Sequence, residues 1–226
     1  MIVCVPARGG SKRVPRKNIR QLNGIPLLCY TLEAIKAANL NTPLYVSTED
    51  DQIAKVALRT PIARVIKRPL ELATDDASTE SVLLHVLDNL PHEMEFPEWV
   101  MVLPPSSPLR KAETIHRFVM RIKDPDFNAD CLMSVTENRG DFWLIQEDGN
   151  MKRLFPDAPR RQQDRKPLYE ENSAIYVTRT SALRETGSIL GKRVQSELIS
   201  PMEGFDINTE QDWAIAEFLA SKHNAL

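Results

Sequence analysis

The sequence predicts an α/β domain in which a mostly parallel sheet carries helices on both faces. Short apolar runs rich in β-branched residues recur along the chain, and segments with helical periodicity separate them. This alternation stops after Glu137, where a differently patterned segment begins. With 226 residues, 42% of them hydrophobic and 27% charged, we expect one domain over residues 1–226 with an inserted arm.

Six segments are predicted to form the strands of this sheet. The first, Met1 to Pro6, is short, apolar and β-branched, as expected of a buried strand. The others are residues 43–48, 63–68, 99–104, 130–135 and 173–178.

Five segments are predicted to be helical: residues 26–40, 51–59, 78–90, 111–123 and from about 210 onward. The first has Pro26 in its first turn, where proline is favoured. Thr209 and Asp212 stand at the start of the last helix with the spacing of a capping box.

The inserted arm is predicted over residues 138–171. Its "FWLIQEDGNMKRLF" (142–155) has two apolar runs around an Asp-Gly-Asn turn, which indicates a β-hairpin, and a polar stretch rich in proline and arginine follows. The insertion is too short for an independent domain and too apolar for a linker. We therefore expect a dimerisation element that packs on a second subunit.

Composition and cysteine usage exclude several classes of function. No apolar stretch approaches the roughly 18 residues of a membrane helix, and the N-terminus lacks the pattern of a signal peptide, so we expect a cytoplasmic protein without a membrane partner. The three cysteines, Cys4, Cys29 and Cys131, are widely spaced among apolar neighbours, which indicates buried, inert thiols. The four histidines show no ligand-like pairing, and a net charge of -2 argues against nucleic-acid binding.

The loop after the first strand, "PARGGSKRVPRKN", is the strongest functional signal. Five of its thirteen residues are basic and none is acidic, although the chain is slightly acidic as a whole. Ligands of open α/β sheets bind beyond the carboxyl ends of the strands, where Gly9 and Gly10 can bring backbone N–H groups against an anion. The loop matches neither the Walker A motif nor Gly-x-Gly-x-x-Gly, so the residues alone leave phosphate binding and a solvated charged loop both open.

The segment "PARGGSKRVPRKNIRQLNGIPLL" resembles the N-terminal signature of the CMP-acylneuraminate synthetase family, the cytidylyltransferases that activate sialic, legionaminic and pseudaminic acids. Four further segments agree in order and spacing: "VSTEDDQIAKVA", "RPLELATDDAST", "PPSSPLR" and "FDINTEQDWAIAE". The resemblance implies a Rossmann-like nucleotidyltransferase sheet. It also implies transfer of CMP from CTP to a nine-carbon 2-keto sugar acid, with Mg²⁺ or Mn²⁺ and release of pyrophosphate.

The resemblance also assigns residues to the nucleotide. Arg8, Ser11 and Lys12 would hold the triphosphate, while Lys17 would meet the α-phosphate as charge develops there. The full set expected to bind the nucleotide is Ala7, Gly9, Gly10, Ser11, Lys12, Asn18, Arg68, Ser78 and Thr79, beside the catalytic Arg8, Lys17 and Asp206. For Ser78 and Thr79, capping of a helix N-terminus is an alternative compatible with nucleotide contact.

The metal is expected at Asp206 and Asn208. Members of the family usually have Asp-x-Asp here, whereas this chain reads Asp206-Ile207-Asn208. An amide oxygen is a neutral ligand, so we expect weaker metal binding or contact through a water molecule. The alternative is that both residues shape a turn before the last helix.

The expected sugar site departs from the family pattern. Pro104 replaces a glutamine, Phe142 stands where a lysine is common, and "YEENSAIYV" (169–177) is closer to legionaminate-activating than to sialate-activating enzymes. Arg161 remains available for the sugar carboxylate, reaching from the partner subunit, with a surface arginine without a specific role as the alternative. Asn172 is also expected to bind the sugar. We therefore expect a nonulosonic acid, with legionaminate-like sugars ahead of N-acetylneuraminate and pseudaminate.

Two other functions stay open on sequence grounds. One is a nucleotidyltransferase for a sugar 1-phosphate, although Glu170 and Glu171 near the sugar site do not favour a second phosphate. The other is a non-catalytic nucleotide- or sugar-acid-binding paralogue, which Asn208 alone favours.

Overall fold

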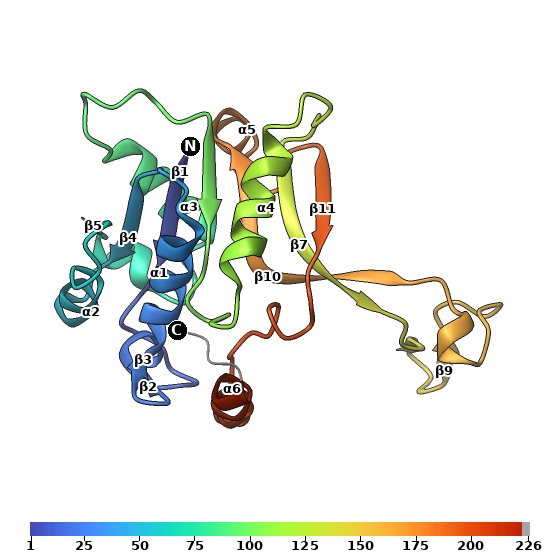
Figure 1. Cartoon of the computed structure of the whole chain (residues 1–226). Coiled ribbons are helices and arrows are strands. Elements are labelled where there is room, and N and C mark those ends of the chain that lie inside the picture. Colours follow the sequence, from blue (N-terminus) through green and yellow to red (C-terminus); the bar gives the residue numbers. More distant parts are fainter. Residues whose placement is uncertain (223–226) are drawn as a thin grey trace.

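A seven-stranded sheet forms the centre of the protein, with strand order β11-β7-β10-β6-β1-β4-β5 (Figure 1). The computed structural model describes residues 1–222, so His223 lies outside the described residues. Four of the six neighbouring strand pairs are parallel, and only β10 runs against its two neighbours, β6 and β7. The predicted, mostly parallel α/β fold is confirmed.

Each predicted run forms a strand, but those predicted over residues 130–135 and 173–178 are longer, and the second begins at Leu168, inside the predicted arm. The sheet consists of β1 (Ile2–Pro6), β4 (Leu44–Thr48), β5 (Ala63–Lys67), β6 (Trp99–Val102), β7 (Cys131–Asn138), β10 (Leu168–Arg179) and β11 (Val194–Leu198). The edge strand β11 is absent from the prediction. Its residues alternate between exposed and half-buried, so pairing with β7 rather than apolar content makes it a strand.

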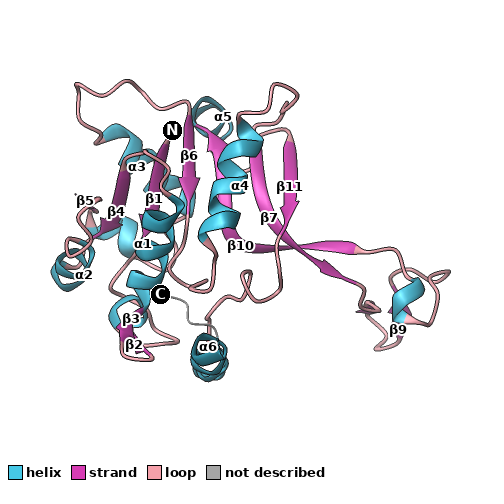
Figure 2. Ribbon diagram, in the orientation of Figure 1, coloured by secondary structure: helices cyan, strands magenta, loops and turns pink. Residues whose placement is uncertain are grey.

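Helices cover both faces of the sheet (Figure 2). The helices are α1 (Leu27–Ala38), α2 (Asp51–Ala57), α3 (Thr79–Asp88), α4 (Ala112–Ile122), α5 (Thr180–Thr186) and α6 (Glu210–Lys222). Helices α1, α2 and α4 pack with Val3 and Val5 of β1, while α3 and α5 pack with Ile2 and Cys4 of the same strand. The alternation of side chains along a strand places successive residues in these two separate cores.

The last helix packs on a smaller cluster below the sheet. Trp213 of α6 is buried with Leu22 of β2 (Gln21–Leu22), which pairs with β3 (Ile25–Pro26). The predicted capping box is present: Thr209 Oγ1 accepts from the backbone N–H of Asp212 at 3.2 Å, and Asp212 Oδ2 accepts from that of Thr209 at 2.8 Å. These contacts fix the segment of residues 205–209 just before the helix.

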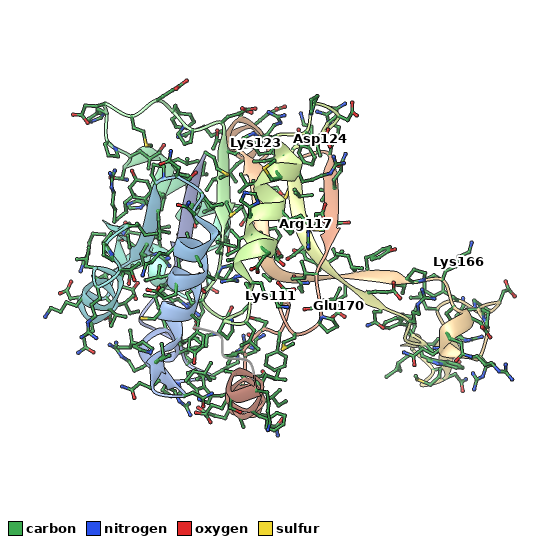
Figure 3. All side chains as sticks on the ribbon, viewed as in Figure 1. Lys111, Arg117, Lys123, Asp124, Lys166 and Glu170 are labelled. Carbon is green, nitrogen blue, oxygen red and sulfur yellow. The ribbon has the colours of Figure 1, made fainter. Side chains whose placement is uncertain are left out.

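The inserted segment projects from the sheet as an arm (Figure 1). Its stem is the outer part of β7 and β10, which pair from Leu168↔Asn138 to Glu171↔Val135. Glu170 lies along this stem and Lys166 lies toward the tip (Figure 3). The tip holds the predicted hairpin, β8 (Trp143–Ile145) and β9 (Met151–Arg153), and the 3₁₀ helix η3 (Gln162–Asp164).

An ion-pair cluster stabilises the tip of the arm. The carboxylate of Asp141 pairs with Arg153 at 2.8 Å and with Arg165 at 3.2 Å. In contrast, much of the apolar surface of the hairpin is exposed, including Trp143 at 44% and Ile145 at 77%. Within residues 1–222, no helix is long and apolar enough to cross a membrane.

Candidate active site

A cleft of about 320 Å³ lies beyond the carboxyl ends of the parallel strands, and the loop after β1 forms one wall of it. Nine residues predicted to bind nucleotide or metal line this cleft: Arg8, Ser11, Lys12, Lys17, Asn18, Arg68, Ser78, Thr79 and Asn208. The opposite wall consists of Pro104, Pro105 and Ser106, which follow β6. The structure therefore brings together residues that are up to 200 positions apart in the sequence.

The first loop lies close to the start of α2. The backbone N–H of Gly9 donates to Oε1 of Glu49 at 2.6 Å. A Cβ atom on Gly9 would lie 2.7 Å from Oδ2 and 3.0 Å from Cβ of Asp50, whereas one on Gly10 would meet nothing nearer than 3.9 Å. The glycine at position 9 is thus required for close approach, and neither glycine has a positive φ.

The cations expected to hold the triphosphate form ion pairs with a carboxylate of the protein. Arg8 and Lys12 both form ion pairs with Asp75, at 2.7 and 2.6 Å. Arg8 also donates to the carbonyl of Thr74 at 2.7 Å. These hydrogen bonds lower the pKa of the Asp75 carboxyl, with the Lys12 ammonium as the largest cause. Asp75 thus provides negative charge where a phosphate is expected.

Lys17 is half-buried at the inner end of the loop, where its Nζ donates to the carbonyl of Ile207 at 2.6 Å. Burial lowers the pKa of this ammonium, and the nearby carboxylate of Asp206 raises it in part. This contact places the lysine next to the segment expected to bind the metal.

Asp206 and Asn208 form a hydrogen bond with each other. The amide nitrogen of Asn208 donates to Oδ2 of Asp206 at 2.5 Å, and its Oδ1 accepts from Arg13 at 3.0 Å. Arg13, which the sequence left without a role, thus lies beside the expected metal ligands. Among residues 1–222 there is no cluster of three or more His, Cys, Asp or Glu side chains suited to hold a metal ion by themselves.

Asn18 and Arg68 also support the walls of the cleft. The amide of buried Asn18 donates to the carbonyl of Arg8 at 2.8 Å, which fixes the backbone that carries this arginine. The guanidinium of buried Arg68 donates to the carbonyl of Ser47 at 3.0 Å, at the end of β4. Their polar groups are therefore partly used within the protein.

The start of α3 forms the side of the cleft that is lined by Ser78 and Thr79. Ser78 is the N-cap, since its Oγ accepts from the backbone N–H of Ser81 at 3.1 Å, and Thr79 is the first helical residue. The capping alternative is therefore present in the structure, together with exposure to the cleft.

The two residues expected to bind the sugar lie outside this lining. Arg161 directly precedes η3, and the segment of η3 lies at the far end of the arm, away from the central sheet (Figure 1). Asn172 lies where β10 enters the sheet, and its Oδ1 accepts from Ser134 at 2.5 Å. Its amide nitrogen is buried, has no hydrogen-bond partner in the described structure, and faces Gly204.

Glu49 and Asp75 are site residues that sequence reasoning missed. Both lie in segments that carry the family resemblance, but only the basic residues of the first loop indicated an anion-binding site. Their position after β4 and before α3 could have placed them at the same sheet edge.

Two of the three cysteines are buried as predicted, and Cys29 is not. Cys4 and Cys131 are buried, and burial raises the pKa of the former to about 12 and of the latter to about 11. Cys29 is half-buried and is also free. These groups stay protonated at neutral pH.

Comparison with known families and proteins is consistent with this geometry. A family profile described as "Cytidylyltransferase" matches residues 2–197. The chain is 30% identical to the CMP-N,N'-diacetyllegionaminic acid synthase of Legionella pneumophila, over 97% of this chain and 95% of that protein. It is 27% identical to an N-acylneuraminate cytidylyltransferase of Streptococcus agalactiae, over 94% of this chain and 51% of that protein.

Solved structures share the fold. A CMP:2-keto-3-deoxy-manno-octonic acid synthetase complexed with CTP superposes with a TM-score of 0.65 at 13% identity, covering 98% of each chain. A 4-diphosphocytidyl-2C-methyl-D-erythritol synthase from Anaerococcus prevotii superposes with a TM-score of 0.65 at 11% identity, covering 97% of this chain and 96% of that one.

Proposed function

The chain belongs to the cytidylyltransferase family, and on this premise we propose that it transfers CMP from CTP to a nine-carbon 2-keto sugar acid. The observation that carries the proposal is the cleft at the strand ends, where Arg8, Lys12 and Lys17 line one wall. A triphosphate brings about four negative charges, which need several cations and N–H groups in one place.

The reaction is an in-line displacement at the α-phosphorus. The anomeric 2-hydroxyl oxygen of the sugar acid forms a bond to this phosphorus while the bond to the bridging oxygen breaks, and pyrophosphate leaves with the electron pair. Asp206 polarises the hydroxyl, whose proton passes to water. Arg8 and Lys12 bind the leaving phosphates, and Lys17 stabilises charge at the α-phosphate.

The donor set at residues 206–208 fits Mg²⁺. This ion usually binds one or two carboxylates together with substrate phosphates and water, and Asp206 supplies one carboxylate beside the phosphate loop. The metal would neutralise charge on the phosphates. The amide nitrogen of Asn208 donates to Asp206 and its oxygen accepts from Arg13, so we propose that it contributes through the second lone pair of this oxygen or through a bound water.

The relatives support the choice of acceptor. Proteins named CMP-N,N'-diacetyllegionaminic acid synthase from Legionella pneumophila and Campylobacter jejuni are each 30% identical and match nearly the full chain. We therefore propose a legionaminate-like nonulosonic acid ahead of N-acetylneuraminate.

The dimer and the cytoplasmic location are further parts of the proposal. The exposed apolar hairpin of the arm supports a homodimer, because a lone hairpin is rarely stable with such surface in water. In that dimer Arg161 would reach the sugar of the partner's cleft. The cytoplasmic location rests on the sequence.

A pyrophosphate-release assay tests the proposed function. CTP, UTP, ATP and GTP are each combined with a panel of nine-carbon and eight-carbon sugar acids and, separately, with sugar 1-phosphates, with Mg²⁺ or Mn²⁺ present. We expect release with CTP and a nonulosonic acid. Absence of release from CTP with every acid would reject the proposal and favour a binding protein, and release only with a sugar 1-phosphate would favour the other enzyme class.

A further inference from the structure

Arg110 is a buried cation behind the wall of the cleft. It is 4% exposed and follows the Pro104–Ser106 wall in the chain. Its Nη1 donates to the carbonyl of Ala174 at 2.8 Å, and its Nη2 donates to Oγ1 of Thr31 and to the carbonyl of Pro104, at 2.7 and 2.8 Å. The next residue, Lys111, lies at the end of α4 that faces the carboxyl ends of the strands (Figure 3).

These three acceptors belong to three different parts of the fold. Pro104 lines the nucleotide cleft, Ala174 follows the Asn172 bulge in β10, and Thr31 lies inside α1. A single planar guanidinium therefore joins the cleft wall to the strand that carries the expected sugar-binding residue. The fixed fork of arginine suits it to hold several carbonyl groups in one geometry.

Hydrogen bonds connect the Pro104–Ser106 wall to the segment of Asp206 and to Lys17. The backbone N–H of Ile207 donates to the carbonyl of Ser106 at 2.9 Å, and the carbonyl of Ile207 accepts from Lys17. On the other side, the buried amide of Asn172 lies against Gly204. Displacement of the Pro104–Ser106 wall would thus move Asp206 and Lys17 relative to β10.

The chemistry of the contact does not favour a purely structural role. Within residues 1–222 the guanidinium donates only to neutral oxygens, and Nε is buried without a partner. Burial lowers the pKa of Arg110 to about 9, although the charge of the Asp206 carboxylate raises it in part, so the side chain is still charged at neutral pH. A buried charge that forms no hydrogen-bonded ion pair is unfavourable for stability, and an apolar side chain would fill the space at lower cost.

We propose that Arg110 is a positioning residue that fixes the nucleotide wall relative to the acceptor strand β10. The inference rests on the proposed function, because it concerns the distance between an acceptor hydroxyl and the α-phosphorus. Reacting atoms must lie about 3 to 3.5 Å apart, and a displacement of 1 Å can lower the rate by roughly a hundredfold.

The test compares Arg110→Lys with Arg179→Lys. Arg179 lies at the other end of β10, donates to the backbone carbonyl of Ala129 and pairs with Glu98, so it serves as a control on the same strand away from the cleft. Lysine keeps the charge but cannot bind three acceptors in a plane. We expect Arg110→Lys to lower kcat by roughly 10- to 100-fold while the Kd for CTP changes less than about threefold, and Arg179→Lys to leave both unchanged.

Thermal unfolding and a second variant keep the result interpretable. Thr31→Val removes one acceptor, and we expect a smaller fall in kcat, about threefold, with unchanged CTP binding. If Arg110→Lys does not fold, Thr31→Val decides. A kcat within twofold of wild type in both folded variants would overturn the proposal. So would a loss of activity that is proportional to the unfolded fraction, or a change that is confined to the KM for CTP. If the wild type turns over in the same assay while the variants behave as just described, the role of Arg110 is rejected and the proposed function stands.

Discussion

Two carboxylates of the protein bind the groups of the first loop that are expected to bind the nucleotide phosphates. Asp75 binds Arg8 and Lys12, and Glu49 binds the N–H of Gly9. If these groups bind CTP as proposed, each contact would be exchanged for one to a phosphate oxygen, and CTP affinity would measure the difference between the two. The carboxylates would then both order a loop of like charges and compete with the substrate.

Asp75→Asn is expected to lower the KM for CTP. The neutral amide competes less strongly for the two cations, and because the ion pairs are exposed the change should be modest, roughly two- to fivefold. Steady-state kinetics at low and moderate salt measure it. Asp76→Asn is the control, since among the described residues Asp76 forms no ion pair. An increased KM for Asp75→Asn would mean that the carboxylate helps to bind the nucleotide.

Lys17→Ala is expected to lower kcat by roughly 10² to 10³, as for other groups that stabilise charge in a transition state. Lys17→Arg tests the pH dependence. Burial lowers the pKa of Lys17, so activity that needs its charge is lost on the alkaline side earlier than for an exposed lysine. Arginine should shift this loss to higher pH in a kcat profile, and an unshifted profile would assign the loss to another group.

Asn208→Asp is expected to lower the Mg²⁺ concentration that gives half-maximal turnover. The variant adds a second carboxylate two residues from Asp206, and charged ligands bind this ion more strongly than an amide. Titration of pyrophosphate release with Mg²⁺ measures the effect. An unchanged requirement would show that residue 208 is not a direct ligand.

Among the elements, the loop after β1 depends on its closeness to the start of α2. The space at Gly9 is closed by Glu49 and Asp50, and Asp50 is itself the N-cap that accepts from Gln52 and Ile53 at 2.8 and 3.0 Å. The loop and the helix start therefore move together. One glycine is needed for this packing and its neighbour is not.

Gly9→Ala and Gly10→Ala test this difference directly. A Cβ at position 9 would lie 2.7 Å from Asp50, so we expect a lower Tm and a raised KM for CTP; at position 10, with the nearest atom at 3.9 Å, neither should change beyond error. Differential scanning fluorimetry and CTP titration are the measurements. Equal effects at the two positions would contradict the packing of the loop.

For the whole molecule, the arm is the part whose tip does not pack against the central sheet. It leaves the sheet as a two-stranded ribbon and holds its tip with the Asp141 cluster, not with the cores of the domain (Figure 1). Its exposed apolar hairpin has no covering element among residues 1–222. Assembly and core stability should therefore be separable.

Ile145→Asp is expected to weaken a dimer without lowering the Tm of the domain. Ile145 is 77% exposed at the tip, where a charge would oppose burial against a second copy. Sedimentation velocity at several concentrations measures the state. The control is Leu58→Asp, an apolar residue 59% exposed after α2, which should leave the dimer unchanged. A monomeric wild type, or a dimer unaffected at Ile145, would remove the role of the arm in assembly.

The sequence by itself determined most of the strands and helices and the basic loop, because periodicity, caps and local charge are encoded within a few residues. The predicted helix over residues 78–90 is α3, and the strand over 1–6 is β1. Only the tertiary structure decided which groups meet in the cleft. Asp75 on Arg8, Lys17 on Ile207 and Arg110 between Pro104 and Ala174 are contacts between distant segments. Such pairings depend on strand order and on the direction of β10, which no local pattern specifies.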